Sequence, residues 1–503
     1  MTIPNLSTFT RVLLGLSLAV IGGLAFVLAF PPYEIWPLAL FGFVPVLIAQ
    51  YRIMPQKFSS LASAVGIAVW LQGYLGPVFA PIGTFMVWLP LIAGGISFLT
   101  EGGQRAFHAK TGYRWFVPAG VTGWAGSEMI RLFIPIAGTW AFIAYPFYRQ
   151  LWFIQPVSIF GIIGMGMLVM MVNHVLALLL MAWLDSRWKL AEEAPAFAPG
   201  LLRGWQVTGS LVVIGWVALS LVLWSIPIGT PKVTVAAIQP DASVIVSANI
   251  GEISLAEELR ERMKEQSREA AAQGAEFIVW PEGALLWDPQ VDDQINLRGL
   301  AAETDAHLAV GYVVILEEGF RNEATVLNPQ GEFLGVFGKD HPVVFGGETS
   351  LTRGTYPVYQ TPLGVVGTII CYDLDYTDTA RKLAAQGVQL IGVPSNDWGS
   401  IADKHYTHVV FRAVENRVAM VKADGGYDSA IISPYGEIIA LAVFPEGGEA
   451  TLVADVQIGT GNGTITTLLG DWAGWLGLVG MIFFGFGGKW LEKRAIRPEV
   501  GNG

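Results

Sequence analysis

Eight apolar segments constrain the fold of this chain more than any other feature. A helix needs about 20 predominantly apolar residues to cross the hydrocarbon core of a membrane. The apolar segments lie at 11–30, 35–50, 59–78, 84–101, 115–134, 158–184, 206–228 and 465–488. The first segment has no convincing small-residue cleavage site and further spans follow it directly, so we predict a retained span rather than a signal peptide. The series predicts a polytopic α-helical membrane domain with about eight spans.

The composition agrees with membrane spans joined to a water-soluble part. Hydrophobic residues make up 53% of the 503 residues and charged residues 14%, and the mean hydropathy is +0.50. The net charge is −11, and no basic stretch with interleaved aromatics points to a nucleic-acid site. The chain has one cysteine, which excludes an intrachain disulfide and any CxxC metal site.

The distribution of Lys and Arg predicts the orientation, because short loops rich in these residues stay in the cytoplasm. Arg11 precedes the first span. The second, fourth and sixth loops and the C-terminal tail also carry these residues: Arg52 and Lys57; Arg105, Lys110 and Arg114; Arg187, Lys189 and Arg203; and Lys489, Lys493, Arg494 and Arg497. The first and third loops carry none, whereas the fifth, with Arg131 and Arg149, fits less well. We therefore expect both termini in the cytoplasm and the segment between the last two spans outside it.

Three regions follow from this pattern. We predict a membrane domain with about seven transmembrane helices at 1–229, an extracytoplasmic domain at 230–462, and a last transmembrane helix with a basic cytoplasmic tail at 463–503. In the middle region, apolar and β-branched strands alternate with polar helical segments. The strands include 231–240, 276–280, 308–315, 364–370 and 389–395. The alternation is typical of the α/β class, with layered sheets covered by helices.

Three chemically useful side chains stand where predicted strands end. Glu282 closes the strand of WPEG, Lys339 follows a hairpin in GKDHP, and Cys371 lies between a strand and a helix. A carboxylate, an ammonium and a thiol can act together as base, oxyanion partner and nucleophile. Spacing alone leaves a plainer interpretation open, in which the glutamate caps a turn, the lysine is a solvated loop cation, and the cysteine is an apolar filler.

Five ordered motifs in this region resemble the signatures of the nitrilase (carbon–nitrogen hydrolase) superfamily. They read FIVWPEG, FGKDHPVVFGGE, GTIICYDLDY, PSNDW and FRAVEN. The resemblance implies an αββα sandwich as the fold. It also implies that Glu282 is the base, Lys339 the catalytic lysine and Cys371 the nucleophile. The single cysteine of the chain falls at the nucleophile position.

The membrane part resembles the apolipoprotein N-acyltransferase family. The matching segments are FPPYEIWPLAL (30–40), WAGSEMIR (124–131) and QPVSIFGIIGMGMLVMMVN (155–173). The resemblance implies transfer of a fatty acyl chain from a membrane phospholipid, through a Cys371 thioester, to the N-terminal amine of the diacylglyceryl-cysteine of apolipoproteins. It further implies a bacterial cytoplasmic (inner) membrane protein that needs no cofactor, and we expect a monomer.

The sequence departs from that family at several positions. It has KDHPVVFGGE where the family has KHHLVPFGE, so the family's second glutamate aligns with Gly347, and Glu348 comes one step later. Asp373 stands in CYD where the family usually has CYE, and Gly425 and Gly426 replace a pair of asparagines. The resemblance implies further supporting or substrate-binding residues. These are Glu348, Tyr372, Asp373, Asn396, Trp398 and Glu415.

Two alternative functions stay open from the sequence. One is a membrane-tethered nitrilase-type amidase that hydrolyses a small amide, which CYD and the altered lysine loop favour. The other is a non-catalytic membrane relative that has kept the fold. His405 and His408 are spaced i, i+3 without further ligands, which makes a weak metal site, so we predict no metal.

Overall fold

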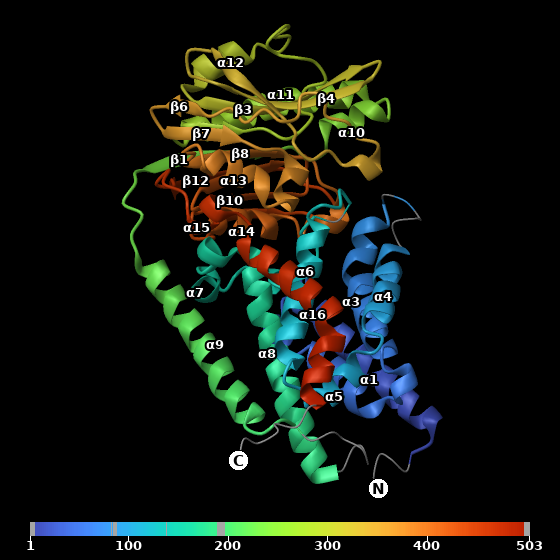
Figure 1. The fold of residues 1–503 in the computed structure, drawn as a ribbon. Helices are drawn as coiled ribbons and strands as arrows, with labels where there is room; N and C mark the ends of the chain where they lie inside the picture. The colour runs from blue at the N-terminus through green and yellow to red at the C-terminus, as the bar shows by residue number, and fades with distance from the viewer. Residues whose placement is uncertain (1–5, 82, 84–87, 137, 189–196, 497–503) are drawn as a thin grey trace.

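The protein, described here from a computed structural model over residues 6–81, 83, 88–136, 138–188 and 197–496, has two parts stacked end to end (Figure 1). A helical bundle forms one part, and two β-sheets with their covering helices form the other. Helix α1 begins and helix α16 ends at the end of the bundle away from the sheets. Three stretches of the sequence predictions lie outside the described residues: 84–87 of the fourth span, 189–196 with Lys189, and 497–503 with Arg497.

The bundle contains long apolar helices and several shorter ones. They are α1 (Thr8–Ala29), η2 (Trp36–Leu40), α2 (Phe43–Ile48), η3 (Ala49–Ile53), η4 (Gln56–Phe58), α3 (Leu61–Phe79), α4 (Leu89–Thr100), α5 (Gln104–Lys110), α6 (Phe116–Arg131), η6 (Tyr145–Phe147), α7 (Leu151–Ile154), α8 (Val157–Trp188), α9 (Leu201–Ser225) and α16 (Trp472–Ile496). Among the described residues, six segments are long and apolar enough to cross a membrane. The other two predicted spans form α4 and α6, with 12 and 16 residues, which are shorter than a straight crossing needs.

Helices α6 and α16 approach each other closely through small residues. Gly474, Gly477 and Gly480 recur every third residue on α16 and face Met129, Ala125 and Thr122 of α6. A Cβ built on Gly477 would lie 2.5 Å from the Cβ of Ala125. Small residues at such contacts let two backbones pack closely in lipid, where van der Waals contact replaces the hydrophobic effect between helices. Through this contact the last helix joins the N-terminal bundle.

The second part contains two six-stranded sheets. The first has the order β12-β1-β2-β3-β4-β5 and the second β11-β10-β9-β8-β7-β6. Their strands are β1 (Lys232–Gln239), β2 (Phe277–Val279), β3 (His307–Leu316), β4 (Gly319–Leu327), β5 (Phe333–Gly338), β6 (Tyr359–Thr361), β7 (Gly364–Thr368), β8 (Leu390–Ser395), β9 (Ala419–Asp424), β10 (Asp428–Ile432), β11 (Ile438–Val443) and β12 (Ala450–Gln457). The centre of each sheet is parallel, as β1, β2 and β3 are in one and β7, β8 and β9 in the other.

Successive side chains along a strand point to opposite faces of the sheet, and both faces of each sheet are buried. In β1, Val235 and Ala237 pack between the two sheets, whereas Ala236 and Ile238 pack under the outer helices. This is the period of two that a pleated strand imposes. The covering helices are α10 (Val244–Asn249), α11 (Ile253–Ala272), α12 (Leu297–Thr304), α13 (Asp378–Ala384), α14 (Tyr406–Asn416) and α15 (Ile465–Leu469). Helices α11 and α12 cover the first sheet, and α13 and α14 cover the second, so the predicted αββα sandwich is confirmed.

Helices α14 and α15 lie between the second sheet and the bundle (Figure 1). One continuous apolar core runs from the bundle helices through this layer and includes Val410 and Ala413 of α14. A polar contact also crosses the junction. The Glu415 carboxylate accepts a hydrogen bond from the backbone N–H of Ile162 at 2.9 Å. That N–H is free because α8 is interrupted at Gly161, whose φ is +68°. The α/β part is therefore docked firmly on the bundle.

We expect Gly477→Leu to destabilise the protein, because the new side chain would overlap α6. Overpacking of this kind costs about 1–3 kcal/mol or more. The measurement is the midpoint of thermal unfolding in detergent, followed by tryptophan fluorescence. Gly485→Leu is the matched control on the same helix, since a Cβ there meets nothing within 4 Å. Equal midpoints for the two variants would contradict the close α6–α16 contact.

Candidate active site

Cys371 lies in a tight turn where the second sheet meets its covering helices. It begins the 3₁₀ turn η8 (Cys371–Asp375), three residues after β7. Its φ is +43°, in the left-handed region that non-glycine residues rarely adopt, and such strain is typical of functional sites. Its side chain is buried, at 7% exposure. The turn therefore holds the thiol in one orientation.

Asp373 ties this turn to the loop that carries the predicted lysine. One of its carboxylate oxygens accepts from the backbone N–H of Ile370 at 2.9 Å. The other accepts from the N–H groups of Asp340 at 3.1 Å and His341 at 2.8 Å. Burial raises the pKa of Asp373 to about 7. The shorter side chain in CYD thus spans the nucleophile turn and the lysine loop.

Lys339 brings two predicted carboxylates together. Its ammonium nitrogen lies 2.8 Å from Glu282 Oε1 and 2.9 Å from Glu348 Oε1. Asn322 of β4 donates to the same two carboxylates, at 2.6 Å to Glu282 and 2.5 Å to Glu348. Glu282 follows β2 and Lys339 follows β5, so these groups meet at one end of the first sheet. The predicted base and lysine are therefore in direct contact.

Electrostatics set the protonation of these groups. Burial alone would lower the pKa of Lys339, which is 1% exposed, but Glu282 and Glu348 raise that pKa well above its usual value. Burial raises the pKa of Glu282 above its usual value, against the opposing effect of Lys339. A carboxylate shifted toward neutral pH is a better general base than an ordinary glutamate. The arrangement suits Glu282 for proton transfer and Lys339 for holding developing negative charge.

A turn at Gly347 brings the carboxylate of Glu348 to the lysine, although Glu348 comes one residue later than the family's second glutamate. Gly347 has a φ of +80°, which glycine adopts at little cost. The chain turns there, and Glu348 Oε2 accepts from the N–H of Val343 at 2.8 Å. Gly347 aligns with the family's second glutamate, and the carboxylate of Glu348 reaches the lysine from the next position.

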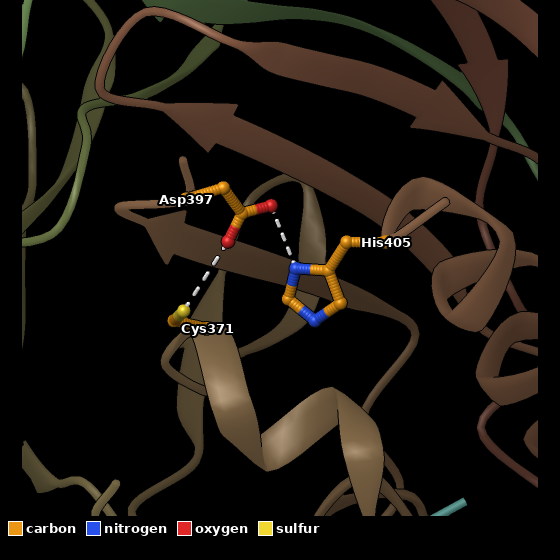
Figure 2. Close-up of side chains that lie close together, drawn as sticks. All are labelled: Cys371, Asp397 and His405. Carbon is orange, nitrogen blue, oxygen red and sulfur yellow. Dashed lines mark hydrogen bonds and ion pairs between the residues drawn. The ribbon is translucent and has the colours of Figure 1, made fainter. Parts of the chain in front are cut away.

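A second ionic cluster contains Asp397, whose carboxylate lies between the thiol and the imidazole of His405 (Figure 2). Cys371 Sγ lies 3.5 Å from Oδ1 of Asp397, which follows β8. The second oxygen, Oδ2, lies 2.7 Å from His405 Nδ1 and 2.9 Å from Lys422 Nζ. Burial alone would raise the pKa of Asp397, but His405 and Lys422 hold it well below its usual value. Burial alone would lower the pKa of His405, but the carboxylates of Asp397 and Asp375 raise it to about 10.

The surroundings keep Cys371 as a thiol in the resting protein. Burial, then the anions Glu282 and Asp397, raise its pKa well above the usual value. Lys339 and the backbone N–H of Asn396 act in the opposite direction and favour the thiolate. Nucleophilic attack therefore needs a base that takes the proton as the bond forms.

An apolar pocket reaches the thiol from the junction of the two parts. Bundle residues Val78, Phe79, Ile136 and Trp140 form one wall, and Val343, Phe345, Tyr372, Trp398 and Ile401 form the other. The polar residues Cys371, Asp375, Asp397 and His405 complete the lining. The indole N–H of Trp398 donates to the carbonyl of Val78 at 3.1 Å, so this side chain joins the two walls.

The remaining predicted residues differ in whether they lie near the Cys371 thiol. Tyr372 lines the pocket, with its ring 5.9 Å from that of Phe345, and Asn396 faces the thiol through its backbone. Glu415 lies elsewhere, at the contact with α8. Reasoning from sequence missed Asn322, Asp375 and Asp397 as site residues, although the strand-end motif PSNDW contains the last of them.

We expect Asp397→Asn to lower the pKa of the Cys371 thiol, because the variant removes an anion that raises it. The pH profile of iodoacetamide alkylation, followed by intact-protein mass spectrometry, should then shift to lower pH. Because the chain has one cysteine, each adduct is assigned without digestion. The exposed Asp455→Asn variant serves as the charge-matched control. A profile unchanged or shifted to higher pH in Asp397→Asn would contradict this electrostatic account.

Comparisons with known proteins agree with the geometry. Residues 22–175 match the model of the apolipoprotein N-acyltransferase N-terminal domain, and residues 234–465 match that of carbon-nitrogen hydrolase. An apolipoprotein N-acyltransferase of Geobacter metallireducens is 27% identical, covering 88% of this chain and 90% of that protein. One from Gloeobacter violaceus is 25% identical, covering 92% of each.

A solved amidase from Nesterenkonia sp. is 19% identical with a TM-score of 0.38, covering 48% of this chain and 97% of that one. The matches to the two family models follow one another along the sequence, and the full-length relatives span both. They confirm the resemblance expected from the motifs. The chain belongs to the apolipoprotein N-acyltransferase family of the nitrilase superfamily.

Proposed function

We propose that this enzyme transfers a fatty acyl chain from a membrane phospholipid to the N-terminal amine of the diacylglyceryl-cysteine of apolipoproteins, through a thioester on Cys371. The pocket is the observation that carries the proposal. Its two walls are apolar, and one of them comes from the bundle. A fatty acyl chain needs such an environment close to the reacting carbon, whereas a small amide does not.

The charged side chains that act on the Cys371 thiol suit the first half of the reaction. Glu282 takes the thiol proton as Cys371 Sγ attacks the ester carbonyl. Lys339 stabilises the oxyanion of the tetrahedral intermediate. When that intermediate collapses, the C–O bond breaks, and Glu282 returns the proton to the departing lysophospholipid. The acyl chain remains on sulfur as a thioester.

The second half transfers the chain to nitrogen. The apolipoprotein amine attacks the thioester carbonyl, Glu282 takes a proton from that nitrogen, and the C–S bond breaks to leave an amide. The proton then returns to the sulfur. A thioester is reactive enough for this exchange, so neither a nucleotide nor a metal is needed. Glu348 and Asn322 hold the side chains of Glu282 and Lys339 in position through both halves of the reaction.

The membrane placement belongs to the same proposal. We place 1–229 in the membrane of a bacterial cell, 230–462 on the extracytoplasmic face, and 463–503 as the last span with a cytoplasmic tail, in a monomer. The Lys and Arg pattern supports both termini in the cytoplasm. The start of α1 and the end of α16 both lie at the bundle end away from the sheets (Figure 1). Both substrates are lipid-anchored, so a site at the membrane surface finds them by diffusion in two dimensions.

The direct test is intact-protein mass spectrometry after incubation with phospholipid vesicles. We expect a mass gain of one fatty acyl chain that hydroxylamine removes, because a thioester is cleaved by that nucleophile. The Cys371→Ala variant, with no other thiol in the chain, should show no gain. Addition of a diacylated lipopeptide with a free amine should discharge the adduct.

Other outcomes would favour the alternatives. An adduct from a small amide but none from phospholipid would point to a membrane-tethered amidase. No adduct from either class would point to a non-catalytic relative.

The proposed orientation in the membrane predicts at which fusion points a reporter protein becomes active. Alkaline phosphatase, which matures only outside the cytoplasm, should be active when fused after the exposed Glu446 and inactive when fused after Gly503. A green fluorescent protein, which matures in the cytoplasm, should show the opposite pattern. Fusions with the reverse activities would contradict the assignment of inside and outside.

A further inference from the structure

We propose that Zn²⁺ binds Cys371, Asp397 and His405 and thereby inhibits the enzyme. The inhibition rests on the proposed acyl transfer through Cys371, whereas the binding of the ion does not. The three side chains come from three separate segments: the turn η8, the end of β8, and the residue before α14. Figure 2 shows the Asp397 carboxylate between the thiol and the imidazole, and all three residues line the pocket.

The distances between the ligand atoms fit a tetrahedral ion. One ligand atom from each residue lies within 4.8 Å of the others. Cys371 Sγ and Asp397 Oδ1 are 3.5 Å apart. Zn–S and Zn–O bonds of about 2.3 and 2.1 Å at a tetrahedral angle put sulfur and oxygen about 3.6 Å apart. His405 Nδ1 now pairs with Asp397 Oδ2, and that hydrogen bond gives way as the nitrogen turns to the ion.

Outer contacts that support metal ligands are already present. His405 Nε2 faces Asp375 Oδ1 at 3.4 Å, and a ligating histidine usually donates its second ring nitrogen to a carboxylate in this way. Asp375 is itself held by the indole N–H of Trp140 at 2.8 Å. Asp397 keeps Oδ1 toward the thiol, while Lys422 holds Oδ2 at 2.9 Å. The side chains of His405 and Asp397 are therefore oriented before the ion binds.

The donor set selects the ion and leaves one position open. Thiolate, imidazole and carboxylate together suit Zn²⁺, whereas Mg²⁺ prefers oxygen ligands alone. All three residues line the pocket, so a water molecule can take the fourth position from that side. The sequence prediction of no metal considered His405 with His408, whereas the proposed site joins His405 to Cys371 and Asp397, which the fold brings within 4.8 Å of one another.

Binding is a ligand exchange without redox chemistry. The Cys371 thiol and the His405 imidazolium each release one proton to the buffer as the Zn–S and Zn–N bonds form, and Zn²⁺ loses waters. The Zn–S bond draws electron density from the sulfur and lowers its nucleophilicity toward the ester. The metal-bound enzyme cannot form the thioester until a chelator or another protein removes the ion.

Cobalt provides a spectroscopic test of the site in the full-length protein in detergent. We expect Co²⁺ to give a thiolate-to-cobalt charge-transfer band that Zn²⁺ abolishes and Mg²⁺ does not. Cys371→Ser should lose the band, and Asp397→Asn and His405→Gln should each weaken Co²⁺ binding at least about tenfold. The control His341→Gln removes a histidine from a separate Asp340–His341–Asp378 group and should keep the band. A band that survives in Cys371→Ser, or that is unchanged in both ligand variants, would overturn the proposal.

Protection of the thiol provides a second readout. Zn²⁺ should slow the alkylation of Cys371 by iodoacetamide at least tenfold, EDTA should restore the rate, and protection should be lost in His405→Gln. Thermal unfolding checks that this variant is folded. His408→Gln should remain protected; loss of protection there but not in His405→Gln would overturn the assignment.

The acyl adduct separates failure of the inference from failure of the proposed function. If phospholipid acylates the metal-free enzyme and Zn²⁺ does not reduce the adduct, the inhibition is wrong. If the cobalt band and the protection appear but no adduct ever forms, the metal site stands and the acyl transfer fails.

Discussion

The buried ammonium of Lys339 is the constraint on which the active site depends. Burying an unpaired charge costs several kcal/mol, and removing one partner of a buried pair costs about 3–5 kcal/mol. Glu282 and Glu348 must therefore both reach this nitrogen. Glu282 follows β2, and Glu348 lies in the loop after β5. The ion pairs that stabilise the buried ammonium therefore also place the carboxylate of Glu282, the proposed base, beside the lysine. Asn322 bridges the two carboxylates and fixes their relative orientation.

The bundle contributes to the site through Asp375. Its carboxylate accepts from Trp140 at 2.8 Å, and its backbone carbonyl accepts from the N–H of Thr139 at 2.8 Å. The carboxylate also faces His405, which in turn holds Asp397 against the thiol. A continuous series of contacts therefore joins a loop of the bundle to Cys371. Because one pocket wall is built from the same region, the α/β part alone would lack both the wall and this support.

The strand pattern predicts the α/β class, whereas the αββα sandwich and the roles expected of Glu282, Lys339 and Cys371 come from the resemblance of the motifs to the nitrilase superfamily. Period-two strands predict the two buried faces, and the motifs around Glu282, Lys339 and Cys371 lie at strand ends that the fold brings together. The rest depended on contacts between distant segments. Nothing near Asn322 or Asp375 in the sequence indicates their partners, and the offset of Glu348 depends on the left-handed turn at Gly347. Glu415 matched a family motif, yet it contacts α8 because a break in that helix exposes a backbone donor.

The charges around Cys371 explain why the resting thiol and the reacting thiolate need different partners. Asp397 and Glu282 raise the thiol pKa, so a free thiolate is scarce before substrate binds. An ester carbonyl in the pocket changes the balance, because charge then moves from sulfur to the oxyanion, away from Asp397. Lys339 is positioned to favour that shift, and Glu282 can accept the proton at the same time. In the proposed mechanism, Asp397 therefore disfavours the free thiolate in the empty site, and an ester carbonyl that can take up the charge removes part of that penalty.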